Sequence, residues 1–236
     1  MVLISHSHEF VFLKTKKAAG SSVEEYFENL LIGEPGGGFS EESAERITRD
    51  AYVSSRGSWK SGAKDFLPSH ATSEKILRSI GDERFHSYTK VSCVRNPWDQ
   101  VVSFFWWRLS LNPFLHRIVE NLPMGLVRLV FTFWFYRARE KIETLSFTKQ
   151  LSLGGTLPKI GIIRYENLQE DLARVTRELG ISLQEFSIPS RKSAQRGRLE
   201  PYQEYYLRPV REAVRESRGD DLANFGYSWS EIDNQK

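Results

Sequence analysis

The sequence predicts an α/β fold in which helices flank a central, mostly parallel sheet. Short apolar runs with the composition of strands covered on both faces occur at residues 10–13, 88–94 and 160–163. A segment with apolar side chains at helical spacing follows each run. Strands that alternate with helices in this way are typical of a parallel α/β sheet.

The first two helices are predicted from their apolar stripes and their end signals. One helix is expected over residues 21–31, with Ser21 and Glu24 as a capping box and Gly33 as its stop. A second helix is expected over residues 72–80.

The helix after the second strand has a well-defined start. Asn96 supplies an N-cap, Pro97 suits the first helical position, and Asp99 places a negative charge in the first turn. The apolar stripe of this helix leaves Ser103 on a different face, where it is available to a ligand. A last amphipathic helix is expected between the strand 160–163 and Gly180.

Length and composition favour one compact domain over residues 1–236, since 40% of the 236 residues are hydrophobic. The single cysteine, Cys93, excludes an intramolecular disulfide and is expected to be a small buried residue. Residues 1–6 lack the basic region and the longer apolar run of a signal peptide, so a cytoplasmic location is expected.

Residues 122–136 are unusually apolar and aromatic. The run includes Arg128 and is shorter than the ~20 residues needed to span a bilayer. Two interpretations stay open: a core or acceptor-site helix, or a contact surface for a membrane or a partner. The sequence does not determine the oligomeric state.

The net charge of +3 is modest, but the basic residues cluster. Such clusters suit an anionic ligand, although lysine and arginine are also common on solvated surfaces. The clustered residues are Lys14, Lys16, Lys17, Arg191, Lys192, Arg196 and Arg198.

The first chemical motif is the run K-T-K-K-A-A-G-S-S at residues 14–22, between a predicted strand and a predicted helix. Backbone N–H groups and the helix dipole at such a place hold phosphate. Gly20 allows close approach of the backbone, and the lysines with Ser21 and Ser22 add donors. The run is not a nucleotide triphosphate loop of the form G-x-x-x-x-G-K-[ST], because its lysines precede the glycine.

The second motif, R-N-P-W-D-Q-V-V-S at residues 95–103, begins where the second predicted strand ends. In a parallel sheet this end lies at the same edge as the first motif. Two separate phosphates of one ligand are therefore expected.

Together the two motifs resemble the signatures of the sulfotransferases that use 3′-phosphoadenosine 5′-phosphosulfate (PAPS), especially the carbohydrate branch. Similarity to the family's late strand at residues 163–168, its nucleotide-covering loop at residues 191–193 and its end at residues 220–227 extends the resemblance over nearly the whole chain. The resemblance implies a P-loop-like three-layer fold and transfer of a sulfuryl group to a hydroxyl of a carbohydrate or glycolipid. No nucleic acid partner is expected.

The resemblance also implies roles for individual residues. The first motif would hold the 5′-phosphosulfate, with Lys17 as its functional lysine; Ala18 departs from the family's usual threonine. Arg95 and Ser103 would bind the 3′-phosphate, His70 would be the general base, and Arg191 and Ser193 would contact the nucleotide. The full set of implied cofactor-binding residues is Lys16, Lys17, Ala19, Gly20, Ser21, Ser22, Arg95, Ser103, Arg191 and Ser193.

Alternatives remain for the sites and for the function. Arg95 could be paired with Asp99, Ser103 could be an ordinary helix serine, and Glu166 is a second candidate base. No metal is expected, because carboxylates and histidines with ligand spacing do not occur together. The competing functions are a P-loop kinase-like phosphotransferase and a non-catalytic module that binds anions or a membrane surface.

Overall fold

The computed structural model describes residues 2–32, 46–47, 51–53, 70–182, 198 and 200–229. The chain groups into two compact units. The first comprises Met1–Val94 and Lys149–Ser190, and the second comprises Arg95–Thr148 and Arg191–Lys236. The single domain expected over residues 1–236 stays a prediction.

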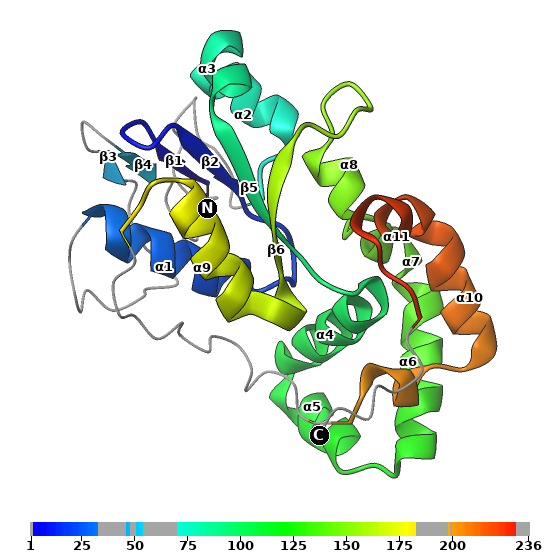
Figure 1. The fold of residues 1–236 in the computed structure, drawn as a ribbon. Helices are drawn as coiled ribbons and strands as arrows, with labels where there is room; N and C mark the ends of the chain where they lie inside the picture. The colour runs from blue at the N-terminus through cyan, green and yellow to red at the C-terminus, as the bar shows by residue number, and fades with distance from the viewer. Residues whose placement is uncertain are drawn as a thin grey trace. The chain divides into compact units, whose positions relative to one another are not determined.

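The first unit is an α/β unit built on a mixed sheet with the strand order β3-β4-β1-β2-β5-β6 (Figure 1). Its strands are β1 (Leu3–Ser5), β2 (Phe10–Leu13), β3 (Arg46–Ile47), β4 (Ala51–Val53), β5 (Thr89–Val94) and β6 (Ile160–Arg164). Its helices are α1 (Gly20–Ile32), α2 (Ser73–Ile80), α3 (Asp82–Ser87), the 3-10 turn η1 (Tyr165–Asn167) and α9 (Leu168–Glu178).

The parallel part of the sheet consists of the three strands that the apolar runs predict. β5 pairs in parallel with β2 on one side and with β6 on the other. The remaining strands, β1, β4 and β3, pair antiparallel. The prediction of an α/β fold is confirmed, and the expected parallel character holds for β2, β5 and β6 within a mixed sheet. The strands that were not predicted are only two or three residues long, too short to show a period.

Two helices pack side by side on the sheet. α1 contacts β1, β4 and β5, whereas α9 contacts β6, and the Thr176 hydroxyl of α9 donates to the Tyr26 hydroxyl of α1. Phe27 of α1 packs against Phe10 and Phe12, which point to the same face of β2 because they are two residues apart. All four residues of β2 are buried, as predicted for a strand covered on both faces.

The start of α1 differs from the prediction. The Ala19 carbonyl accepts the first helical hydrogen bonds, from the Ser22 and Val23 N–H groups at 2.9 and 3.2 Å. Ser21 therefore lies in the first turn and not at the N-cap, so the predicted capping box is wrong. Glu24 binds a lysine from the preceding loop instead. The predicted stop, Gly33, lies outside the described residues.

The second unit is helical. Its elements are α4 (Pro97–Ser110), α5 (Pro113–Glu120), α6 (Met124–Arg137), α7 (Arg139–Glu143), the 3-10 turn η3 (Tyr202–Tyr205), α10 (Arg208–Ser217) and α11 (Gly219–Phe225). Within α8 (Phe147–Leu151) the chain passes from this unit to the first. An aromatic core joins α4, α6 and η3, and the edges of the Phe105 and Tyr205 rings meet Phe131.

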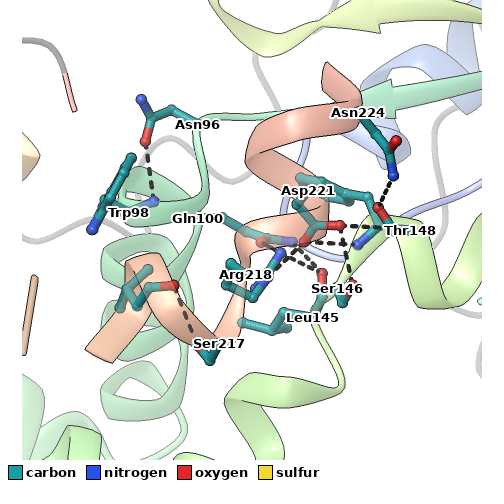
Figure 2. Close-up of polar contacts among 12 residues, drawn as sticks. Asn96, Trp98, Gln100, Leu145, Ser146, Thr148, Ser217, Arg218, Asp221 and Asn224 are labelled. Carbon is teal, nitrogen blue, oxygen red and sulfur yellow. Dashed lines mark hydrogen bonds and ion pairs between the residues drawn. The ribbon is translucent and has the colours of Figure 1, made fainter. Parts of the chain in front are cut away.

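A buried ion pair holds α4, α10 and α11 of the second unit together (Figure 2). The Arg218 and Asp221 side chains are fully buried, and Nε of Arg218 lies 2.6 Å from Oδ2 of Asp221. Arg218 also donates to the Gln100 side chain, and Asp221 accepts from Ser146 and from the Thr148 N–H. Because an opposite charge and hydrogen bonds offset the cost of burying a charge, this network joins α4 to the turn between α10 and α11.

The segment 122–136 forms most of α6 and uses only one of its sides in the core. Val127, Phe131 and Phe135 are buried, whereas side chains on the opposite side are exposed. No helix in the described ranges has both the length and the apolar character that crossing a membrane requires.

Candidate functional site

The loop between β2 and α1 is tied to the neighbouring strand at its start. The Thr15 hydroxyl donates to the Cys93 carbonyl of β5, and the Ser92 hydroxyl donates to the Leu13 carbonyl at 2.7 Å. Cys93 itself is fully buried, as predicted, and burial raises the pKa of its thiol. The carboxyl ends of β2 and β5 are therefore held together, which fixes where the loop leaves the sheet.

An ion pair anchors the loop to the helix that follows it. The Lys14 ammonium lies 2.5 Å from the Glu24 carboxylate of α1, and both side chains are almost fully buried. A buried pair of this kind is a structural element, since either charge alone would be costly. Lys14 thus positions the loop, and the more exposed cations of the cluster, Lys16 and Lys17, are the candidates for ligand binding.

The backbone of the loop has an alternating conformation. φ is +60° at Lys17 and +59° at Ala19, whereas Ala18 and Gly20 do not have positive φ. Alternation between positive and non-positive φ is the backbone pattern in which consecutive N–H groups can turn toward one point and form an anion-binding nest. Left-handed backbone at non-glycine residues costs on the order of 1–2 kcal/mol each and is often found at functional sites.

The loop leads directly into the N-terminus of α1. The first helical hydrogen bonds are made by the N–H groups of Ser22 and Val23. The N–H groups of Gly20 and Ser21 precede them in the first turn, where a helix supplies no carbonyl acceptor. These donors and the positive end of the helix dipole favour an anion at this place.

Gly20 is required by the close packing of the loop. A Cβ atom at this position would lie 2.8 Å from Lys14 Cγ and 3.3 Å from the Thr15 carbonyl oxygen. Lys14 cannot easily move away because its ammonium is held by Glu24. Ser21 is partly exposed, whereas Ser22 and Ala18 are buried, so Ser21 is the hydroxyl with better access to a ligand.

His70 lies beside the loop. Its Nδ1 atom is 3.1 Å from the Lys14 carbonyl oxygen, which also accepts a 2.7 Å hydrogen bond from the Gln150 amide. Because a carbonyl only accepts, Nδ1 carries the proton in this contact, and the neutral ring keeps its lone pair on Nε2. Burial and, to a smaller extent, the charges of Lys14 and Lys16 together lower the pKa of His70 to about 3. His70 is therefore neutral at pH 7.

The second motif begins the second unit and has regular helix-start geometry. Asn96 caps α4 by accepting from the Trp98 N–H at 3.1 Å, with Pro97 at the start of the helix, as predicted. Asn96 also donates to the Tyr202 hydroxyl.

The guanidinium of Arg95, the first residue of this motif, forms an ion pair with a carboxylate of α4. Its Nε and terminal nitrogen both lie 2.7 Å from one oxygen of Asp99. The alternative in which Arg95 pairs with Asp99 is therefore realised. Ser103 is partly exposed on α4.

The structure brings some of the predicted site residues together within the first unit: the loop residues 16–22 and His70. Arg191 and Ser193 lie outside the described residues. Glu166 is exposed in η1. Within the described segments, no group of three or more His, Cys, Asp or Glu side chains is arranged to hold a metal ion, and the expected metal independence stays a prediction.

Sequence reasoning missed one residue that shapes the loop, Gln150, and assigned another, Glu24, to the wrong partner. Gln150 is far from the loop in sequence and has no motif of its own, so only the fold reveals its bond to Lys14. Glu24 was recognised, but it was assigned to a local capping box and not to Lys14. Comparison with models of protein families, with curated proteins and with solved structures gave no match.

Proposed function

We propose that this chain is a sulfotransferase that transfers a sulfuryl group from PAPS to a hydroxyl of a carbohydrate or glycolipid. The observation that carries the proposal is the loop at residues 14–22, whose alternating backbone leads into the N-terminus of α1 beside His70. An N–H nest with adjacent lysines suits a phosphosulfate. The resemblance of both motifs to PAPS-dependent sulfotransferases supplies the identity of the nucleotide.

In the proposed reaction the acceptor oxygen attacks sulfur in line with the leaving group. A new O–S bond forms, and the bond between sulfur and the bridging oxygen of the phosphosulfate breaks. The electron pair of that bond leaves with 3′-phosphoadenosine 5′-phosphate. Lys17 stabilises the charge that develops on the leaving oxygen, and the loop N–H groups hold the 5′-phosphate.

The acceptor proton goes to Nε2 of His70 in this proposal. The contact of Nδ1 with the Lys14 carbonyl supports it, because that contact leaves the lone pair on Nε2. A pKa of about 3 is low for a base at neutral pH. An anion bound beside Lys16 would raise the pKa of His70, but burial, the largest cause of the lowered pKa, would still favour the neutral ring.

Further parts of the proposal rest on the resemblance. Arg95 and Ser103 bind the 3′-phosphate, Arg191 and Ser193 contact the nucleotide, and the chain adopts a P-loop-like three-layer fold. No metal takes part, because lysine and arginine neutralise the leaving bisphosphate. The order of residues in the first motif supports this reading over a kinase, since no lysine follows Gly20.

The test of the proposal is a nucleotide titration by calorimetry with 3′-phosphoadenosine 5′-phosphate, AMP and ATP, each with and without magnesium. Binding that prefers the bisphosphate and does not need magnesium is expected. Lys17→Ala should weaken binding of the bisphosphate by about tenfold or more, because the variant loses a charge-assisted hydrogen bond. ATP binding that depends on magnesium would favour a kinase, and absence of nucleotide binding would favour a non-catalytic module.

A second measurement separates binding from chemistry. Transfer of labelled sulfate from PAPS to a panel of glycans and glycolipids should fall by about 10²–10⁴-fold in turnover in His70→Ala, with little change in bisphosphate affinity. Gln150→Leu should give a smaller loss, because Gln150 only positions the carbonyl that orients His70. Equal turnover in the wild type and His70→Ala would exclude His70 as the base.

A further inference from the structure

α6 has apolar side chains on two opposite sides. Val127, Phe131 and Phe135 are buried in the core of the second unit. Leu126, Leu129, Phe133 and Tyr136 are exposed, and Phe133 has 65% of its surface accessible. These four exposed residues are spaced by three, four and three positions, so they lie on one side of α6. That side is opposite the side formed by Val127, Phe131 and Phe135. The core therefore does not account for the exposed side.

The preceding helix has the same property. Val119 of α5 is buried in the same core, whereas Phe114, Leu115 and Ile118 are exposed. Phe114 has 73% of its surface accessible. α5 and α6 are in contact with each other. We call the exposed apolar side chains of α5 and α6 named here the α5–α6 surface. Exposed large apolar side chains are ordinary when they occur singly, but clustered on adjacent helices they mark a binding surface.

The charges on α5, on α6 and on the following helix α7 indicate the occupant of this surface. Arg117, Arg137, Arg139 and Lys141 are exposed on α5, α6 and α7, and they outnumber the exposed acids Glu120 and Glu140. The Arg137 guanidinium lies over the Phe133 ring, 5.4 Å from its centre. An occupant must therefore accept an apolar ring and a cation at the same spot.

We propose that the α5–α6 surface docks on a membrane that contains anionic lipids. The apolar side chains enter the boundary between headgroups and acyl chains, while the arginines and Lys141 reach lipid phosphates. A second copy of the chain fits less well, because pairing through the same face would bring arginines of like charge together. The proposal does not depend on the enzymatic activity.

The test uses the full chain and sedimentation with vesicles of phosphatidylcholine alone or mixed with phosphatidylserine. Binding to the mixed vesicles is expected, weaker binding to the neutral ones, and a decrease of binding as salt rises. The variant Phe114→Ser/Phe133→Ser should partition about tenfold more weakly or worse, since both rings are exposed and buried only on docking. Arg117→Glu/Arg137→Glu should lose the preference for phosphatidylserine.

Leu207→Ser is the matched control. Leu207 is another exposed apolar residue of the second unit, and it lies outside α5 and α6. This variant should bind vesicles like the wild type, and unchanged circular dichroism would show that all variants are folded. Equal binding to both kinds of vesicle, or equal binding by wild type and Phe114→Ser/Phe133→Ser, would overturn the proposal. A dimer that Phe114→Ser/Phe133→Ser dissociates, without any vesicle binding, would assign the surface to self-association instead.

Discussion

The two basic motifs differ in how they present positive charge. In the loop at residues 14–22 the distinctive feature is the backbone, because φ alternates in sign over residues 17–20. One of its lysines, Lys14, forms an ion pair with Glu24. At residues 95–103 the backbone is an ordinary capped helix start, and the charge comes from the Arg95 side chain. The first motif is thus distinguished by its backbone geometry, and the second by the charge of one side chain.

Because the two motifs differ in this way, substitutions are expected to act differently in each of them. A nest of N–H groups is lost when the backbone moves, even if every charged side chain stays in place. A side-chain site is lost when the side chain is removed, and it is adjusted when the charge of its partner changes. The comparison between the motifs can therefore be tested with variants that alter either backbone geometry or charge.

The largest effect is expected for Gly20→Ala, which adds no charge and removes none. Its Cβ would lie 2.8 Å from Lys14 Cγ, so the loop must shift. Loss of two charge-assisted hydrogen bonds from the loop N–H groups should weaken binding of 3′-phosphoadenosine 5′-phosphate, measured by calorimetry, by about 100-fold. Gly161→Ala in β6 is the control, because its added Cβ would have no atom nearer than 3.5 Å. Unchanged affinity in Gly20→Ala would mean that the nest does not hold the ligand.

A smaller loss is expected for Arg95→Ala. Removal of a charge-assisted contact to a phosphate should weaken bisphosphate binding by about tenfold to a hundredfold. The same change leaves the Asp99 carboxylate without its ion-pair partner, so thermal stability should also fall. AMP, which lacks the 3′-phosphate, should bind equally well to the wild type and the variant. An equal loss for AMP would show a general effect on the fold.

The fold could be predicted from sequence where elements are long and their patterns regular. The strands β2, β5 and β6 and the helices α1 and α2 lie within one or two residues of their expected bounds. α4 begins at its predicted cap, and α9 lies between the third predicted strand and Gly180. β1, β3 and β4 could not be predicted, because such short strands form through pairing with a neighbour.

The candidate site could be predicted only in part. The positions of the loop and of the α4 cap follow from local sequence, since turn chemistry acts over a few residues. The bonds of His70 and Gln150 to the Lys14 carbonyl join residues that are far apart along the chain, so no local pattern reports them. The capping box failed because a buried lysine ammonium is a stronger partner for Glu24 than a backbone N–H.

Asp99→Asn tests the role of Arg95 by removing the charge of its partner. The variant keeps Arg95 and removes the negative charge that lies 2.7 Å from its guanidinium. If Arg95 binds a phosphate, the bisphosphate should bind a few-fold more tightly, because repulsion between Asp99 and the ligand is lost. If Arg95 serves only the fold, affinity should stay the same while thermal stability falls. Calorimetry together with a melting curve distinguishes the two results.

The smallest effect is a pH dependence of stability that His70 adds to the loop. Its pKa is about 3 in the folded chain, below its ordinary value of 6.5. Between these values the unfolded chain binds a proton that the folded chain does not, so stability is lost as pH falls from 6.5 toward 3. Urea unfolding of the wild type should show a decrease of about 1 kcal/mol from this residue between pH 7.5 and 5, allowing for its partial exposure. His70→Gln should lose less stability over the same pH range.

The contribution of His6, whose pKa is lowered mainly by burial and also by the charge of Arg84, is common to both proteins and cancels in the comparison. Parallel pH profiles for the two proteins would mean that His70 is not buried against the loop in its neutral form.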